Sequence, residues 1–243
     1  MRDHLVFQLQ APLSSWGETA VGDYRPSSEQ PTQSALVGLL GAALGVQRHD
    51  EAGHAALRDG YAFAVASLDN GHLLRDYHTA QVPPRSALKG HPHATRAHEL
   101  ALPARELSTT VSTRDYRQGA HHLVAVQAQD AQPRWSLDTL AQALRTPVYA
   151  LSLGRKTCVP GAPLWPQRLA ATSVLDALTQ YRQQLSQALG QPLPELESLA
   201  FDDRVCEPGT APTFTRRRKD RLIRCQGWQF GDRDEHLALF KDI

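Results

Sequence analysis

A glycine followed by two cations, Gly154-Arg155-Lys156, is the sharpest chemical signal in this sequence of 243 residues. A glycine at the end of a strand lets the backbone approach a partner closely. The turn that follows can direct backbone N–H groups and a guanidinium at one phosphate group. The pattern therefore predicts that Gly154, Arg155 and Lys156 contact a phosphate.

Aromatic side chains beside basic residues indicate what kind of molecule offers that phosphate. They occur at Trp16, at Tyr77 and in the run Arg114-Asp115-Tyr116-Arg117. Single-stranded RNA is usually held by this mixture, with bases stacked on rings and phosphates paired with cations. We therefore expect Trp16, Tyr77, Arg114 and Tyr116 to belong to an RNA-binding surface.

Residues for metal or acid–base chemistry show no motif. The 11 histidines lack the H-x-x-x-H spacing of a helical metal site, and the three cysteines form no C-x-x-C pair. We therefore expect no metal, no cofactor and no catalytic residue. A metal-independent endoribonuclease remains the alternative, and its acid, base and stabilising groups would be His78, Tyr116, His121 and Lys156.

The other charged clusters are less specific. Asp202-Asp203 and the run Asp232-Arg233-Asp234-Glu235 are interpreted as solvated surface. The basic run Arg216–Arg224 leaves two interpretations open, a solvated strand face or further phosphate contacts. Because 26 Lys and Arg almost balance 25 Asp and Glu, a nucleic-acid site must be a local patch. Since neither a signal peptide nor a membrane span is visible, we expect a cytoplasmic protein without membrane contact.

The elements that must position these residues follow an α+β order. Apolar spacing predicts strands over 5–10, 61–66, 122–126 and 148–151, and helices over 34–44, 51–59, 137–145 and 173–189. Thr32 is the expected N-cap of the first helix and Gly45 its expected end. The Pro- and Gly-rich stretch 81–112 is interpreted as an excursion from the core. Short strands are expected around 213–217 and 222–230. This order is close to a ferredoxin-like split βαβ.

Several stretches together resemble one protein family. They cover residues 9–17, 25–26, 31–45, 74–79 and 149–158, and include Leu13-Ser14-Ser15-Trp16-Gly17 and Ser152-Leu153-Gly154-Arg155-Lys156. Their order and spacing are similar to those of the CasD family, the fifth-family CRISPR-associated subunits of the type I-E Cascade complex. That family belongs to the RAMP superfamily.

The resemblance implies a ferredoxin-like or RRM-like core with a protruding thumb hairpin and a small C-terminal extension. Residues 1–160 would form the RNA-binding core, with the thumb at about 79–113, and 161–243 would be a helix and strand extension packed on it. The implied role is to grip the 5′ handle of the CRISPR RNA and to cap the backbone filament in antiviral defence. Expected partners are the backbone subunit CasC and the large subunit CasA, with target DNA met only through the complex. Because CasE cuts the RNA in such systems, the chain would not be an enzyme.

The resemblance also suggests how the site is assembled. A helix start at Thr32–Ser34 would offer its N–H groups and positive dipole end to a phosphate. Arg25 lies in the loop just before it, and Gly154–Lys156 would close the same surface. The expected RNA-binding set therefore gains Arg25, Thr32 and Ser34.

Overall fold

Strand β1 (Arg2–Gln10) lies inside a sheet with a helical layer on each face. In the computed structural model, which describes residues 1–240, this sheet has seven strands in the order β10-β1-β9-β6-β11-β13-β12. Every neighbouring pair is antiparallel. The other strands are β6 (Tyr61–Asp69), β9 (His121–Ala128), β10 (Gln167–Ala171), β11 (Ser198–Asp202), β12 (Phe214–Arg224) and β13 (Gln229–Leu239).

The two faces of the sheet build two separate cores because successive strand residues point to opposite sides. On one face Leu5 and Phe7 of β1 pack with α1 (Gln33–Leu44), α2 (Glu51–Gly60) and α4 (Leu137–Arg145). On the other face Val6 packs with α5 (Val174–Leu189). Full burial of each such side chain contributes about 1.5–3 kcal/mol. Among the described helices, none has the length and apolarity needed to cross a membrane.

Helix α1 forms as its local sequence predicts. The Thr32 hydroxyl accepts a hydrogen bond from the Ala35 N–H at 3.2 Å, which confirms the expected N-cap. Gly45 adopts a left-handed φ of 78° and ends the helix as expected. The predicted helices at 51–59, 137–145 and 173–189 are also confirmed, with ends shifted by one residue or so.

The predicted strand at 148–151 is wrong. The N–H groups of Val148 and Tyr149 instead donate to the carbonyls of Ala43 and Ala42, at 3.0 and 3.1 Å. These carbonyls belong to the last turn of α1, where regular helical partners are lacking, and that of Ala42 also accepts the Gly45 N–H at 3.3 Å. The segment therefore caps a helix end, and the strand that pairs with β1 is β10, nearly twenty residues later, which the sequence did not predict.

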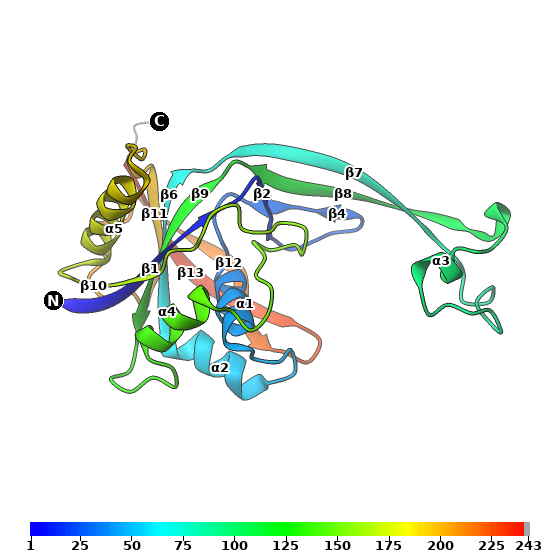
Figure 1. Ribbon diagram of the computed structural model, residues 1–243, viewed down its shortest axis with the longest axis horizontal. Coiled ribbons are helices and arrows are strands. Elements are labelled where there is room, and N and C mark those ends of the chain that lie inside the picture. Colours follow the sequence, from blue (N-terminus) through cyan, green and yellow to red (C-terminus); the bar gives the residue numbers. More distant parts are fainter. Residues whose placement is uncertain (241–243) are drawn as a thin grey trace.

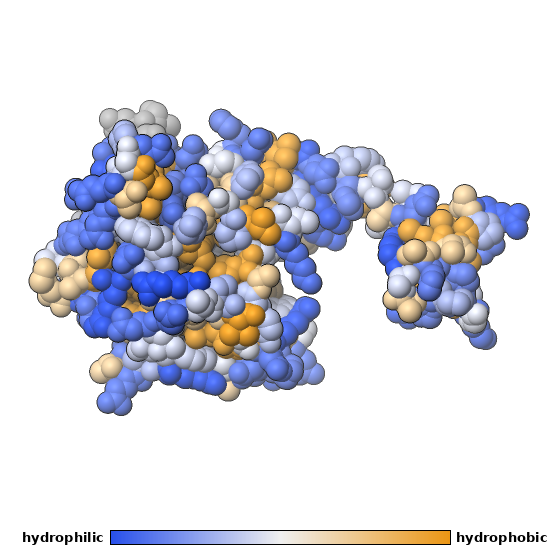
Figure 2. All heavy atoms as spheres, in the orientation of Figure 1, coloured by the Kyte–Doolittle hydropathy of each residue, from blue (hydrophilic) through white to orange (hydrophobic). Residues whose placement is uncertain are grey.

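A long hairpin projects from the body of the molecule (Figure 1). Its strands are β7 (His72–Val82) and β8 (Ser108–Gln118), and they pair in register along their whole length. Residues 83–107 lie at its far end, a separate mass of atoms in Figure 2, with the short helices α3 (Arg96–Glu99) and η1 (Ala104–Glu106). The excursion predicted at 81–112 is therefore the outer part of a hairpin that begins nearer the body.

Four short strands surround the base of this hairpin. They are β2 (Leu13–Ser14), β3 (Trp16–Gly17), β4 (Tyr24–Arg25) and β5 (Ser27–Ser28). Strands β2 and β4 pair with β8, while β3 pairs with β5. The N-terminal loop that follows β1 is thereby fixed to the root of the hairpin.

Residues after 160 join the same sheet as those before it. Strand β10 pairs with β1, and β11 pairs with β6. The division into a core of residues 1–160 and an extension of residues 161–243 packed on it stays a prediction. The strand expected at 222–230 is interrupted in its middle. The chain turns between Cys225 and Trp228, whose N–H donates to the Cys225 carbonyl at 3.1 Å, so 222–224 end β12 and 229–230 begin β13.

Candidate nucleic-acid interface

Basic and aromatic side chains gather where the hairpin meets the body. Arg25 in β4 lies opposite Arg114 in β8, so the two side chains share one face of this small sheet. Tyr116, two residues further along β8, shares that face too. The guanidinium of Arg155 lies over the Tyr116 ring, 4.5 Å from its centroid. We call these four residues, Arg25, Arg114, Tyr116 and Arg155, the basic face.

Arg155 is held in place by two main-chain carbonyls. Its Nη1 donates to the Asp115 carbonyl at 2.8 Å and its Nη2 to the Arg25 carbonyl at 3.0 Å. These bonds tie the loop after Gly154 to both β8 and β4. Lys156, the next residue, is exposed beside them. The structure thus brings the predicted Arg25, Arg114, Tyr116, Arg155 and Lys156 into one region.

Gly154 allows this loop to reach the N-terminal segment. It has a φ of 93°, and a Cβ atom built on it would overlap the carbonyl oxygen of Ser15. The Ser15 N–H in turn donates to the Leu153 carbonyl at 3.0 Å. Gly154 therefore permits the close backbone approach predicted from the sequence, although its partner in the structure is another part of the chain.

Asp115 fixes the root of the hairpin from the opposite face. Its carboxylate accepts hydrogen bonds from Nε of Arg75 at 2.9 Å and from the Tyr24 hydroxyl. The Arg75 guanidinium holds the pKa of Asp115 below its usual value. The Asp115 carbonyl also accepts a bond from Oγ of Ser15 at 3.1 Å. The buried Asp115 thus holds the root of the hairpin to the N-terminal loop that contains Ser15 and Tyr24.

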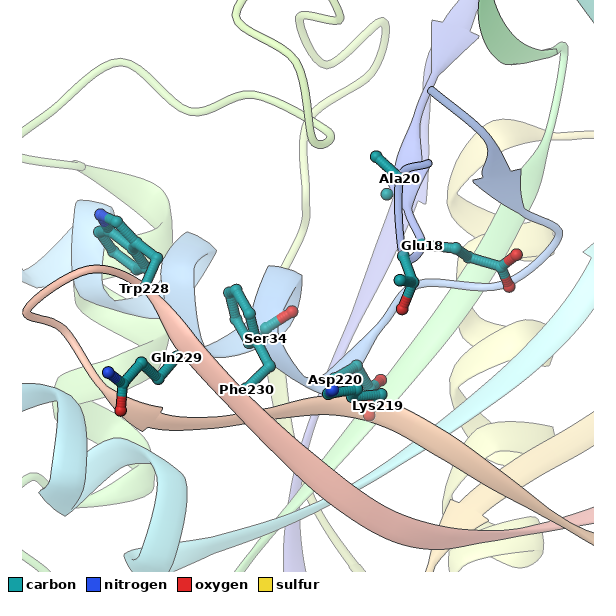
Figure 3. Close-up of a pocket in the computed structure, with 10 residues that line it drawn as sticks. Glu18, Ala20, Ser34, Lys219, Asp220, Trp228, Gln229 and Phe230 are labelled. Carbon is teal, nitrogen blue, oxygen red and sulfur yellow. The ribbon is translucent and has the colours of Figure 1, made fainter. Parts of the chain in front are cut away.

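A groove runs from the basic face along the start of α1. It consists of three adjoining cavities of about 440, 510 and 300 Å³ that share Gly17 and Glu18. Arg25, Gly154 and Arg155 line the first cavity, and Lys219 lines the other two. Figure 3 shows one cavity, with Glu18 and Ala20 on one side and the β12–β13 hairpin on the other.

The start of α1 is less available to a phosphate than predicted. Thr32 is buried, and its hydroxyl is used as the cap. The Gln33 N–H donates to Oδ2 of Asp220 at 2.9 Å, so a carboxylate already lies at the positive end of the helix. Ser34 remains: its Oγ lies 3.2 Å from Oγ1 of Thr32, and its side chain lines the groove. Thr32 lines the groove as Ser34 does, so both stay predicted RNA contacts, although the Thr32 hydroxyl is already engaged as the cap.

Two predicted stacking residues lie outside the groove. Trp16 is only 2% exposed and meets His122 edge-on in the core, so its ring offers no surface to a base. Tyr77 is 70% exposed but pairs with Thr113, which places it on the opposite face of the hairpin from Arg114. Its ring is open to solvent, yet it does not join the basic face.

Two members of the acidic clusters interpreted as solvated surface, Asp202 and Glu235, belong instead to a buried ionic cluster, whereas Asp203, Asp232 and Asp234 are exposed as expected. We define this cluster as Asp202, Asp220, Glu235, Arg218 and Arg233, all at most 8% exposed where exposure is measured on the side chain. Arg233 donates to Asp220 at 2.6 Å, to Asp202 at 2.8 Å and to Glu235 at 2.7 Å. The solvated interpretation of Asp202 and Glu235 was therefore wrong.

The pKa values of the three carboxyls record this arrangement. Burial alone raises the pKa of Asp220, but the hydrogen bonds and charge of Arg233 bring it below its usual value. Burial likewise opposes ionisation of Glu235, and the nearby Arg218 and Arg233 lower its pKa overall. For Asp202 burial prevails, and its pKa is raised despite Arg233. Since Asp220 also binds the start of α1, the ionic cluster fixes the β12–β13 hairpin against one side of the groove.

The basic run 216–224 divides between side chains in ion pairs of the fold and side chains that line the groove. Arg216 donates to Glu235 at 2.6 Å, and Arg221 pairs with Asp59 at 3.1 Å. Arg217 and Lys219 are exposed and line the groove. The inward-facing members therefore stabilise the fold, while the outward-facing ones remain available to a ligand.

The residues of the nuclease alternative are not assembled into one site. His78 lies opposite Ser112, six residues and about 20 Å along β8 from the end of the strand near His121. His121 is buried, with its Nε2 3.0 Å from Oε1 of Gln8. Burial lowers its pKa to about 4, so it is neutral at pH 7 and packed inside the sheet.

Buried histidines make the protein sensitive to acid. Burial lowers the pKa of His121 to about 4 and that of His122 to about 3, whereas an exposed histidine in the unfolded chain titrates near 6.5. Because the unfolded state binds protons first, stability is complete above pH 6.5 and falls as the pH drops toward 4. At pH 5 the loss is about 2 kcal/mol per histidine. Urea unfolding at pH 7 and pH 5 measures it.

The variant His121→Gln is expected to lose less stability between these pH values than the native chain. His78→Gln is the control, since the His78 side chain is 44% exposed. If both variants show the native pH dependence, His121 does not contribute to the acid sensitivity.

Trp228 and Phe230 are groove residues that the sequence did not predict. Both line the cavities beside Ser34, and both rise from the β12–β13 hairpin in Figure 3. The sequence placed them inside a strand, where an aromatic residue is usually core. The pair Gly227-Trp228, a glycine beside a large ring, is the signal that indicates an exposed turn.

Comparisons with known proteins agree on one family. Residues 4–233 match the family described as CRISPR-associated protein (Cas_Cas5). The CRISPR system Cascade subunit CasD of Escherichia coli (strain K12) is 32% identical over 189 residues, which cover 74% of this chain and 78% of that protein.

Two solved structures share the fold. A chain of a CRISPR RNA-guided surveillance complex superposes with a TM-score of 0.63 at 24% identity, over 97% of this chain and 89% of its own. A crystal structure of a Cas protein superposes with a TM-score of 0.60 at 23% identity, over 97% and 94%.

Proposed function

The chain belongs to the CRISPR-associated Cas5 family, and from this premise we propose that it is a non-catalytic subunit of a type I-E Cascade surveillance complex. In this role it binds the 5′ handle of the CRISPR RNA and caps one end of the backbone filament. Its partners are then the subunits CasC and CasA, with target DNA met only through the complex. The setting is the cytoplasm, and the purpose is antiviral defence.

The observation that supports the proposal most is the junction of the basic face with the groove. Arg25 and Arg155 belong to both, so one strand of RNA can contact cations of the hairpin root and then enter the groove. Lys219 continues the line of positive charge past α1. Such a track suits a single strand, whose phosphates are spaced along one path.

The order of the strands supports the finer architecture proposed for the chain. Strands β1, β6, β9 and β10 follow the chain order of a split βαβ, with the last strand beside the first and the third between the first and the second. This order supports a ferredoxin-like core. We assign the β7–β8 hairpin the role of the thumb, which extends the contact surface beyond the body toward a neighbouring subunit.

Exposed lysines near the junction offer the cleanest test. Within the described residues, neither Lys156 nor Lys219 is in an ion pair, so their replacement leaves the fold intact. The double variant Lys156→Gln, Lys219→Gln is expected to bind a short repeat-derived RNA with a salt dependence flattened by about 1.4 log units per log unit of salt, at about 0.7 per lost phosphate contact. Fluorescence anisotropy over a series of salt concentrations measures the slope.

Arg168→Gln provides the matched control, because Arg168 is a cation on β10, at the other end of the sheet order. It is expected to leave the slope unchanged. A native chain that shows no salt-dependent binding of the RNA contradicts the proposed function. Native binding with an unaltered slope in the double variant removes the two lysines from the interface.

A further inference from the structure

The turn between β12 and β13 holds a tryptophan in an unusual backbone conformation. Trp228 has a φ of 50°, in the left-handed region that large side chains rarely occupy. A residue held there costs about 1–3 kcal/mol, and such residues concentrate at ligand sites. Glycine adopts this backbone conformation at lower cost, so a tryptophan here suggests that the indole ring has a role of its own.

Two neighbours fix the indole ring of Trp228 from the side of α2. The guanidinium of Arg48 lies over the ring, 4.9 Å from its centroid. His54 meets it at 77°, with 6.1 Å between the ring centroids. The ring is thus oriented before any ligand arrives, which lowers the entropy cost of binding to it.

The ring of Trp228 separates two hollows. On the side of Arg48 it lines a cavity of about 650 Å³ that also contains Cys225 and His49. On the other side it lines the groove, together with Phe230 and Ser34. Trp228 therefore borders both the cavity beside Arg48 and the groove.

We propose that Trp228 is a stacking platform for one unstacked nucleobase of the bound RNA. This inference rests on the proposed function. It adds that the groove receives an unstacked base of the RNA. Lys219 and the Ser34 hydroxyl lie in the same cavity as the ring, where they contact the phosphate and sugar of that nucleotide. Phe230 provides a second apolar surface for the base.

The charges in the groove favour a nucleotide over an apolar protein side chain. Arg25 and Arg155 line the cavity that contains Trp228, and Lys219 lines the next one. The carboxylate of Asp220, which also lines the groove, is paired with Arg233 at 2.6 Å. Glu18 lines all three cavities as well, so the ring lies among three cations and one carboxylate besides the paired Asp220. This excess of cations matches the combination of base and phosphate in a single strand.

An abasic scan tests the inference without altering the protein fold. A repeat-derived RNA is prepared with one base removed at a time, which leaves every phosphate in place. Stacking of a base on an aromatic ring contributes about 1–3 kcal/mol, so one abasic position is expected to weaken binding to the native chain about 5- to 150-fold. Trp228→Leu should bind the intact RNA more weakly by the same factor. Removing the base at that position should then weaken binding to this variant no further.

Trp135→Leu is the matched control, because Trp135 is also half-buried and lies 4.6 Å from the guanidinium of Arg134. This variant should keep the native abasic profile, and Trp228→Phe should restore part of the affinity. The salt slope of Trp228→Leu should equal the native slope, since no phosphate contact is lost.

The outcomes separate the inference from the proposed function. If the native chain does not bind the RNA, the proposed function fails. If it binds but no single abasic position weakens binding, or if Trp228→Leu keeps the native profile, the stacking platform is contradicted while the function stands. Weaker assembly with protein partners at unchanged RNA affinity would assign Trp228 to a protein contact and overturn the proposal.

Discussion

Replacing Gly154 by alanine is expected to destabilise the protein strongly and to disorganise the basic face. Two effects add. Alanine at a φ of 93° is strained by about 1–2 kcal/mol, and the new methyl group would overlap the carbonyl of Ser15. That carbonyl is backbone and the Ser15 N–H is bonded to Leu153, so neither segment can move without losing a hydrogen bond. With about 1–3 kcal/mol for the forced contact, the total loss is about 2–5 kcal/mol.

Gly119→Ala separates strain from overlap. Gly119 has a φ of 76°, and nothing lies within 4 Å of the position its Cβ would take. It is therefore expected to lose only the strain energy, about 1–2 kcal/mol. Chemical unfolding of both variants measures the difference. Equal losses would mean that the close approach at Ser15 is not a constraint. Because Arg155 follows Gly154 directly, Gly154→Ala should also weaken RNA binding, whereas Gly119→Ala should not.

Removing Arg233 is expected to have the second large effect. In Arg233→Met the carboxylates of Asp202 and Asp220 lose their closest cation and remain buried. Breaking a buried ionic arrangement by removing one partner costs about 3–5 kcal/mol. Since Asp220 holds the start of α1 through the Gln33 N–H, the groove should also lose its shape. Thermal unfolding and RNA affinity measure the two consequences.

The pH dependence of Arg233→Met identifies the cause. Without the guanidinium, burial raises the pKa values of the remaining carboxyls above those of the unfolded chain. The folded variant then binds protons more readily, so its deficit relative to the native chain should shrink as the pH falls from 8 to 5. Arg168→Met is the control: Arg168 also has two carboxylate partners at 2.6 Å, Asp3 and Asp138, but it is 47% exposed. Its loss should be below about 1 kcal/mol. A pH-independent deficit for Arg233→Met would indicate lost packing instead of buried charge.

Local signals predicted the parts of the fold that depend on local structure. Helix α1 has an N-cap at Thr32, an apolar stripe and Gly45 at its end, and all three act within a few residues. The segment 148–151 has the apolar run of a strand, yet its N–H groups cap α1. Its partners lie a hundred residues earlier, which no periodicity records. Strand β10 is short and mixes polar with small residues, so its pairing with β1 is also determined by tertiary structure.

The sequence predicted which residues share the candidate site where residue type and position in a motif were enough to indicate it. Arg25 and Arg155 were expected at a shared surface, and they meet there. Trp16 was misjudged because a large ring beside a loop looks the same in sequence whether it is exposed or buried. The ionic cluster leaves no local signal in the sequence, because Arg233 lies within an acidic run and its partners Asp202 and Asp220 lie on other strands. Only the pairing of β11, β12 and β13 brings them together.

The place of β6 within the sheet bears on how the chain is made. One edge of β6 pairs with β9, but the other waits for β11, which begins only at Ser198. At a synthesis rate of about 5–20 residues per second, the ribosome needs on the order of ten seconds to deliver that strand. Until then the nascent chain exposes the unpaired edge of a strand whose first eight residues are all buried in the folded protein. Strand β11 therefore protects an aggregation-prone edge of β6. A chain truncated before Ser198 should be insoluble.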